Sequence, residues 1–391
     1  MLICAVSIGI SSSEGGIMAG TQRSVVAEQA RAIADAWSPP DAPESWWLTA
    51  ATFAAIAEEE ALLDLAAAIP PDRLPPLLLG AAVGFLAPGS DLAHHYPHPG
   101  GPQPPRDPDF GAEVAAFARD RHSDLAELCA AHRYQMNEVG RSADVLPALA
   151  LIAAEDDRPL AMVDLGTGAG LGLRLDRYHY TYKAPDGSRS CVGDPTAPVR
   201  LECAVRSGTP PVPARIPVIA DRVGVDVEPL DLTDPHVLAW LAACVPPEAG
   251  AVTRFTAASA LARAIPARTV QGNLLDVLPE VIASLPSDAL VCLVDTYVHV
   301  FLRPAELQRF DSLLTELGRD LEWVSIDLLV PLGPEARATV QGLEVPDAWV
   351  RENREGGVSG VIGRVSVRNG DRTGTVLGRA HPGAAWLEWQ N

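Results

Sequence analysis

Cysteines are few in this sequence, and none forms a pair with the spacing of a metal site. The 391 residues include six cysteines, scattered along the chain without a C-x-x-C element. This pattern argues against a zinc knuckle and offers no disulfide framework. We therefore expect a reducing, cytoplasmic location.

Basic residues are also scarce. Lysine and arginine together number 30 against 50 acidic residues, which gives a net charge of −20 at pH 7. Such a charge repels phosphate backbones and anionic lipid surfaces, and no basic cluster offsets it. Nucleic acid and membranes are therefore not expected as partners. A neutral or cationic small molecule fits better, and a homo- or hetero-oligomer stays open.

The sequence has no hydrophobic run long enough to span a bilayer. Its apolar start, residues 1–10, lacks the positive region of a secretory signal and is too short for a transmembrane helix. We expect residues 1–20 to be a disordered extension, with Met18 as an alternative start.

The residues that are present fit a two-domain globular protein. Hydrophobic residues make up 48% of a chain that exceeds the usual size of a single core. Four Ala- and Leu-rich stretches with helical spacing, broken by proline pairs, cover residues 24–37, 46–68, 74–85 and 110–134. We predict an N-terminal helical domain over 21–133 and an α/β domain over 134–391.

An irregular Gly- and Pro-rich loop in the helical part carries three histidines, His94, His95 and His98. Histidine binds metals, but most such sites combine it with cysteine or acidic ligands. No such partner stands out beside these histidines. We therefore expect that this loop forms a surface turn or one wall of a substrate pocket, and that it binds no metal.

The most informative stretch of the chain is Asp164-Leu-Gly-Thr-Gly-Ala-Gly170, which follows the apolar run 160–163. This order predicts a strand that runs into a ligand-binding turn. Gly166, Gly168 and Gly170 have no Cβ, so the backbone can turn sharply and approach a ligand. Asp164 can accept a hydrogen bond from a cationic amine or a hydroxyl. A purely structural turn is the alternative that stays open.

The glycine spacing favours one class of ligand. A dinucleotide fingerprint needs its third glycine three residues after the second, whereas this turn reads G-x-G-x-G with an acidic residue before it. The order resembles motif I of the class I S-adenosylmethionine-dependent methyltransferases. That resemblance implies S-adenosylmethionine as a cofactor, bound at the turn.

Further apolar runs predict four more strands after the glycine turn. They lie near 223–226, 269–273, 289–294 and 321–329, with helical stretches between them. The alternation predicts an α/β fold with a doubly wound, mostly parallel Rossmann-like sheet, preceded by the N-terminal helical domain. Such a sheet is methyltransferase-like, and it binds ligands at the carboxyl ends of its strands.

Polar side chains follow two of these strands and complete the predicted cofactor site. Asp226 is the candidate for the ribose hydroxyls, with Glu228 as second choice. Asn273 and Asp276 can contact an adenine edge. Since Asp is common at helix N-caps, a capping role for Asp226 and Asp276 stays open.

Several elements together resemble an uncharacterised actinobacterial family, the domain of unknown function 2332. They are Gln135-Met-Asn-Glu-Val-Gly-Arg141, the glycine turn, Gly193-Asp-Pro195, Asp226-Val-Glu-Pro229 and Gly378-Arg-Ala-His-Pro-Gly383. The resemblance covers the chain from about residue 46 onward. It implies a methyltransferase-like fold without a settled activity.

Three positions depart from that family. Its members usually have Ser at the position of Gly168, an acid at that of Asn273 and His at that of Asp295. These changes imply altered ligand contacts or a lost one.

The segment 174–215 is longer than a single crossover helix between two strands requires, and it predicts an inserted hairpin. Tyr178, Tyr180 and Tyr182 alternate along it, with Arg177 and His179 beside them. If the hairpin covers the pocket, Arg177, Tyr178 and Tyr182 are candidate substrate contacts. The alternative is that the aromatic side chains pack one face of an ordinary hairpin.

Asn137, Glu138 and Arg141 are expected at the start of a long helix, where their spacing places them on one face. They would then project together toward the cleft between the domains, with Glu138 as general base, Arg141 as an anion clamp and Asn137 as an orienting donor. The alternative is a surface pair of Glu138 and Arg141.

The C-terminal stretch 360–389 predicts closing antiparallel strands. Asn369-Gly370 stands between two alternating runs, which is a typical hairpin signal.

The leading functional hypothesis is S-adenosylmethionine-dependent methyl transfer to a small molecule in specialised metabolism. Two alternatives stay open: the fold repurposed for cofactor-independent elimination or cyclisation, and a non-catalytic subunit of a heteromeric enzyme. Tyr297 joins the candidate substrate contacts. The candidates for acid-base catalysis are Glu138, His179, Asp295 and His299.

Overall fold

The computed structural model describes residues 15–40, 42–298, 301–329, 339–354 and 359–390. The chain divides into two compact units. Unit 1 comprises Met1–Asn137 and Thr233–Thr256, and unit 2 comprises Glu138–Leu232 and Ala257–Asn391. Helix α9 (Ala249–Ala264) is divided between them. Within the described residues, no helix is both long enough and apolar enough to cross a membrane.

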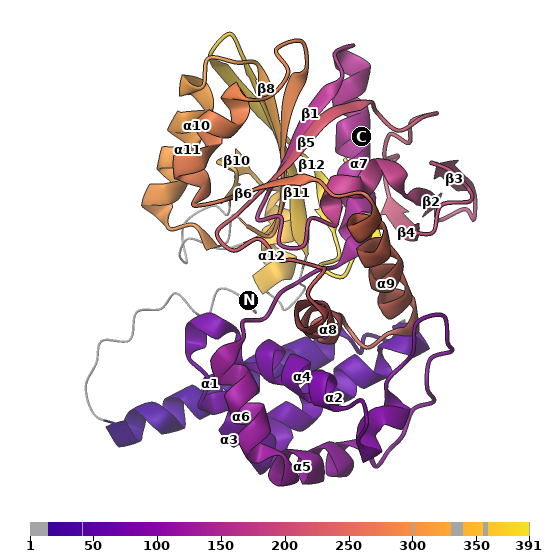
Figure 1. Cartoon of the computed structure of the whole chain (residues 1–391), viewed down its shortest axis with the longest axis vertical. Helices are drawn as coiled ribbons and strands as arrows, with labels where there is room; N and C mark the ends of the chain where they lie inside the picture. Colours follow the sequence, from indigo (N-terminus) through magenta and orange to yellow (C-terminus); the bar gives the residue numbers. More distant parts are fainter. Residues whose placement is uncertain (1–14, 41, 299–300, 330–338, 355–358, 391) are drawn as a thin grey trace. The chain divides into compact units, whose positions relative to one another are not determined.

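Unit 1 is helical where the structure describes it (Figure 1). Its α-helices are α1 (Gly15–Ala36), α2 (Trp47–Glu58), α3 (Glu60–Ala67), α4 (Pro75–Leu86), α5 (Phe110–Asp120), α6 (His122–Ala131) and α8 (Pro235–Ala243). Short 3-10 helices are η2 (Glu44–Trp46), η3 (Pro71–Arg73) and η4 (Asp91–His95). Helix α1 begins at Gly15, so residues 15–20 are helical and do not belong to a disordered extension. Residues 1–14 lie outside the described residues.

Two of the expected long helices are each divided in two. Glu59 has an extended backbone, with φ −85° and ψ 120°, and it separates α2 from α3. Arg121, with φ −109° and ψ 24°, separates α5 from α6. The apolar spacing continues across both breaks, so the sequence pattern alone did not reveal them.

A distant segment of the chain completes the core of unit 1. Trp240 of α8 is 5% exposed, and its ring centroid lies 5.7 Å from that of Phe85 in α4. Its indole Nε1 donates to the carbonyl oxygen of Arg133 at 2.9 Å. The helical unit therefore is not built from the N-terminal part of the chain alone.

Unit 2 is built on one eleven-stranded sheet, in the order β3-β2-β4-β13-β12-β11-β8-β7-β1-β5-β6. Its strands are β1 (Leu160–Leu165), β2 (His179–Lys183), β3 (Arg189–Val192), β4 (Arg200–Ser207), β5 (Ile219–Asp226), β6 (Arg268–Gln271), β7 (Leu290–Thr296), β8 (Leu321–Leu328), β11 (Gly360–Arg368), β12 (Asp371–Ala380) and β13 (Trp386–Trp389). A separate two-stranded sheet pairs β9 (Thr339–Val340) with β10 (Leu343–Glu344).

The helices of unit 2 include the 3-10 helices η5 (Val139–Arg141) and η6 (Gly172–Arg177) and the α-helices α7 (Ser142–Glu155), α10 (Leu274–Ala283), α11 (Pro304–Glu316) and α12 (Asp347–Arg354). Apolar side chains of β1, β5, β7 and β8 pack with α10 and α11 in one buried cluster. Val163, Leu293 and Leu321 in this cluster are fully buried.

The prediction of a doubly wound, mostly parallel Rossmann-like sheet behind an N-terminal helical domain is wrong. The strands expected after the helical part, β1, β5, β6, β7 and β8, do pair in parallel. The sheet, however, continues through β11, β12 and β13 with antiparallel pairs, and β4 joins β13 to β2 and β3. The result is a mixed sheet with more than twice as many strands as the parallel sheet that was expected.

The cause of this error is long-range strand pairing. The segment expected to be an inserted hairpin does contain an antiparallel pair, β2 with β3. It does not stand alone, because β4 of the same segment pairs with β13 near the C-terminus. The predicted Asn369-Gly370 hairpin is confirmed, since β11 and β12 pair antiparallel around it and Asn369 has φ 52°.

Candidate functional site

The glycine turn after β1 has the backbone conformation that its sequence predicted. Gly166, Gly168 and Gly170 have φ values of 65°, 51° and 67°, in the left-handed region that favours glycine. The turn is held against β5 because the amide of Gly166 donates to the carbonyl oxygen of Val225 at 2.8 Å. The carboxyl ends of β1 and β5 thus form one edge.

Asp226, the last residue of β5, binds the glycine turn directly. Its Oδ2 accepts a hydrogen bond from the amide of Gly168 at 2.8 Å, and its Oδ1 accepts from the amide of Glu228 at 2.9 Å. The carboxylate therefore stabilises the turn. It retains further lone pairs, because a carboxylate can accept about four hydrogen bonds. Glu228 itself is exposed.

Asp164 is a half-buried carboxyl at the same edge. Its Oδ2 accepts from the hydroxyl of Thr167 at 2.7 Å. Burial raises the pKa of Asp164 to about 6; the hydrogen bond from Thr167 opposes this shift, and the negative charge of Asp226 adds to it. Its Oδ1 has no hydrogen-bond partner among the described residues, so this oxygen can accept from a ligand.

One side of the turn is covered by the protein itself. A Cβ placed on Gly166 would lie 2.4 Å from Cγ2 of Val298. The expected open approach to Gly166 is therefore closed by an apolar side chain. The absence of a Cβ here allows Val298 to pack.

Asp295, at the end of β7, is the most deeply buried of the predicted catalytic groups that the structure describes. It is 2% exposed, and it accepts from Nε1 of Trp323 at 2.6 Å and from the hydroxyl of Ser325 at 3.2 Å. Burial raises its pKa to about 7, although both hydrogen bonds oppose the shift. Asp295 can therefore hold or release a proton near neutral pH. The other catalytic candidate from this region, His299, lies outside the described residues.

Arg141 lies in a buried polar cluster of unit 2. It is 5% exposed, its guanidinium carbon lies 4.1 Å from the ring centroid of Tyr297, and its Nε donates to the carbonyl oxygen of Pro382 at 3.3 Å. Tyr297 has a positive φ of 66°. The guanidinium of Arg141 thus stacks on an aromatic face, and Arg141 is buried, so the alternative of an exposed surface pair with Glu138 does not describe it.

The expected common helix face of Asn137, Glu138 and Arg141 is wrong. Helix α7 begins at Ser142, and Arg141 belongs to the 3-10 helix η5. Glu138 precedes η5 and caps it, because its Oε1 accepts from the amide of Gly140 at 2.7 Å. The side-chain amide of Asn137 donates to the carbonyl oxygen of Gln135 at 3.3 Å. The chain is not yet helical at 137 and 138, so i,i+4 spacing does not apply there.

The predicted substrate contacts on the insertion have structural partners. Tyr178 and Tyr182 are buried in the core, and their hydroxyls donate to the carbonyl oxygens of Leu171 and Ala143, each at 2.7 Å. His179 is buried as well. Arg177 is exposed and pairs with Asp176. The packing alternative accounts for both tyrosines, and a contact with substrate stays a prediction for all four.

Asn273 precedes α10, and Asp276 lies in its first turn. The side-chain Oδ1 of Asn273 accepts from the amide of Leu275 at 2.9 Å, which makes Asn273 the N-cap. Asp276 is exposed, with an ion pair to Arg309 at 3.0 Å. Both side chains thus have a local structural role, and their contact with adenine stays a prediction.

Sequence reasoning missed Asp144 of α7. It is 1% exposed, its Oδ2 has no hydrogen-bond partner among the described residues, and burial raises its pKa well above the usual range. The hydroxyl of Tyr297 is likewise buried and without a hydrogen-bond partner in the described part of the chain. The available signal was an acidic residue inside the otherwise apolar run 143–152.

Comparison with known proteins identifies the family and little more. The model of a family described as uncharacterised protein conserved in bacteria (DUF2332) matches residues 23–389. No curated protein matches. A crystal structure of a possible exported protein from Bordetella parapertussis is 15% identical, over 88% of this chain and 83% of that one, with a TM-score of 0.25, and this likeness supports no conclusion. The chain belongs to the bacterial family with the domain of unknown function 2332.

Proposed function

We propose that this protein is a small-molecule methyltransferase that binds S-adenosylmethionine at the glycine turn between β1 and β5. The main support for this proposal is a pair of carboxylates, those of Asp164 and Asp226, beside three glycines with positive φ. Two acidic groups at one strand edge favour a ligand with a cationic sulfonium and a cationic amino group. The net charge of −20 agrees with a cationic ligand.

The chemistry of the donor set fits this cofactor. Asp164 Oδ1, which has no partner among the described residues, would accept from the amino group of the donor. Asp226 would use its remaining lone pairs for ribose hydroxyls while it stays bound to the amide of Gly168. When bound, the cofactor supplies an activated methyl group. The protein then has to hold the acceptor in line and exclude water.

Asp295 is the proposed proton acceptor for the substrate nucleophile. A general base works best with a pKa near the operating pH, and burial raises the pKa of Asp295 to about 7. We place the reaction in the cytoplasm, because the cysteines are scattered. We place the acceptor among the small molecules of specialised metabolism in an actinobacterium, as the sequence-based hypothesis has it.

Calorimetric titration of the protein with S-adenosylmethionine and S-adenosylhomocysteine tests the proposal. We expect binding of both at submillimolar concentration, since both carry the amino group. Asp164→Asn should weaken binding at least about tenfold, because a charge-assisted hydrogen bond contributes about 1.5–3 kcal/mol. Asp288→Asn is the matched control, because it removes an exposed carboxylate before β7. If neither compound gives a heat of binding although the protein is folded, the proposal is contradicted.

A second candidate is cofactor-independent elimination or cyclisation at the same edge. Two observations favour it: Val298 covers Gly166, and both oxygens of Asp226 already accept hydrogen bonds from backbone amides. In that case Asp295 would act as base without any donor nearby. A folded protein that ignores both adenosyl compounds, yet loses activity on its substrate in Asp295→Asn, would favour this candidate. The third possibility, a non-catalytic subunit, stays a prediction.

A further inference from the structure

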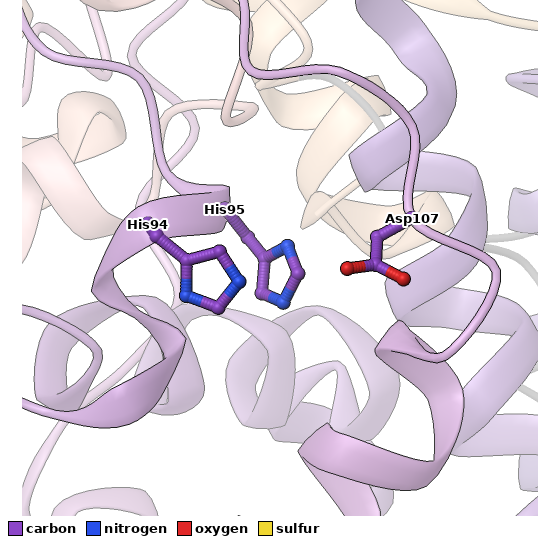
Figure 2. A group of neighbouring side chains, drawn as sticks. All are labelled: His94, His95 and Asp107. Atoms are coloured by element: carbon purple, nitrogen blue, oxygen red, sulfur yellow. The ribbon is translucent and has the colours of Figure 1, made fainter.

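Two histidines and a carboxylate gather in unit 1, far along the chain from the glycine turn. His94 and His95 end η4, and Asp107 lies in the loop before α5. One ligand atom from each of the three residues lies within 4.8 Å of the other two. Figure 2 shows the two imidazoles side by side, with the carboxylate of Asp107 facing them across from His95. The ring centroids of His94 and His95 are 3.8 Å apart.

Hydrogen bonds fix which ring nitrogen each histidine offers. Nδ1 of His94 lies 2.6 Å from the carbonyl oxygen of Asp91, and Nε2 of His95 lies 2.8 Å from Oε2 of Glu113. Both partners are acceptors, so these two nitrogens must donate. In the neutral rings, Nε2 of His94 and Nδ1 of His95 therefore carry lone pairs. A hydrogen bond from the second ring nitrogen to a carboxylate or carbonyl is the usual support of a metal-ligating histidine.

The surrounding packing holds His95 and the loop in place. His95 is 1% exposed, and its ring lies edge-on to Phe110, with centroids 5.0 Å apart, and to Trp47, with centroids 6.1 Å apart. Nε1 of Trp47 donates to the carbonyl oxygen of Pro104 at 2.9 Å, which ties the Asp107 loop to α2. Asp107 itself accepts from the amide of Asp109 at 2.9 Å. Two of the three groups thus lie on a fixed frame.

We propose that His94, His95 and Asp107 bind a divalent transition-metal ion, with Zn²⁺ as the best-matched ion and Glu113 as the group that orients His95. Two imidazoles and one carboxylate suit Zn²⁺ and its neighbours, whereas Mg²⁺ and Ca²⁺ prefer oxygen ligands alone. Three protein ligands leave a coordination position for water or a substrate, as in catalytic zinc sites. Bonds from zinc to its ligand atoms are about 2.0–2.2 Å long, so the ligand atoms of a bound ion must lie closer to one another than 4.8 Å. The exposed His94 side chain moves inward on binding.

We propose this site in place of the expectation that the histidine loop binds no metal. That expectation depended on the lack of an acidic partner beside the histidines. The partners come from farther along the chain: Asp107 is twelve residues after His95, and Glu113 lies in α5. The site belongs to unit 1 and does not depend on the proposed methyl transfer.

Titration of the chelator-treated, full-length protein with Zn²⁺ tests the site. We expect one ion per chain. Glu113→Gln should weaken binding by about 10–100-fold, as expected for an outer carboxylate that orients a ligand, and His94→Ala should weaken it further. His98→Ala is the matched control, because His98 is an exposed histidine of the same loop outside the group. Circular dichroism confirms that each variant is folded.

Co²⁺ provides an independent spectroscopic readout. Visible absorption bands of bound Co²⁺ should appear in the wild type and in His98→Ala, and should be lost in His94→Ala. Equal Zn²⁺ affinity of His94→Ala and the wild type would overturn the proposal. So would the absence of binding at submillimolar Zn²⁺, or a loss in His98→Ala as large as in His94→Ala.

Discussion

At the scale of single residues, the turn after β1 depends on a glycine for two separate reasons. Gly166 has φ 65°, and an added Cβ would lie 2.4 Å from Val298. Gly187 has φ 84°, with nothing within 4 Å of an added Cβ. We expect Gly187→Ala to cost about 1–2 kcal/mol from backbone strain, and Gly166→Ala about 2–5 kcal/mol from strain and overpacking. Urea unfolding measures both, and equal losses would contradict the packing of Val298 on the turn.

The buried carboxyl of Asp295 predicts how stability depends on pH. Its folded pKa is raised from 3.8 to about 7, so between these values the folded state holds a proton that the unfolded chain releases. Its contribution to stability is therefore fully present below about pH 4 and lost as the pH rises through about 7. The loss is on the order of 2–4 kcal/mol.

Asp295→Asn removes this titration, because an amide stays neutral. We expect the free energy of unfolding of the wild type to fall more steeply between pH 5 and pH 8 than that of the variant. Urea unfolding at a series of pH values gives both slopes. Asp288→Asn, which changes an exposed carboxylate, should keep the wild-type slope. Identical slopes in Asp295→Asn and the wild type would show that Asp295 ionises normally.

The residues named from the sequence differ in how well local patterns identify them. The conformation of Gly166, Gly168 and Gly170 follows from local spacing, because positive φ is a local property. The surroundings of Arg141 and Asp144 do not, since their burial depends on segments such as Pro382 and Cys203 that are distant in the chain. Tyr178 could be read either way, because an aromatic residue suits a core as well as a pocket.

At the scale of elements, α8 is an integral part of unit 1, although it begins at Pro235 and the preceding helix of this unit, α6, ends at Ala131. Trp240 packs against Phe85 and His132, with ring centroids 5.7 and 4.3 Å apart. Trp240→Ala should destabilise the protein by about 3–5 kcal/mol, as for other large truncations in a core. Val227→Ala, at a residue that is 67% exposed, should change stability by less than about 0.5 kcal/mol. Thermal unfolding compares them, and similar small effects would contradict the packing of α8.

Elements with strong local signals agree with their sequence patterns. The Asn369-Gly370 turn specifies the β11–β12 hairpin, and proline marks the first turn of α4 at Pro75. The breaks at Glu59 and Arg121 had no Gly or Pro to mark them, so periodicity continued through them.

At the scale of the whole molecule, the strands were easier to predict than their partners. Hydrophobic runs located β1, β5, β7 and β8, because buried parallel strands are nearly continuous in apolar residues. The pairing of β4 with β13 joins residues near 204 and 386. No local pattern encodes that contact, and it makes the sheet mixed where a mostly parallel one was expected.

The most direct test of the proposed function is a crystal structure of the protein soaked with S-adenosylhomocysteine. We expect density for the ligand at the carboxyl ends of β1 and β5, with its amino group within hydrogen-bond distance of Asp164 Oδ1 and its ribose hydroxyls on Asp226. A turn that stays closed by Val298 without ligand density, at saturating concentration, would contradict donor binding and with it the proposed methyl transfer.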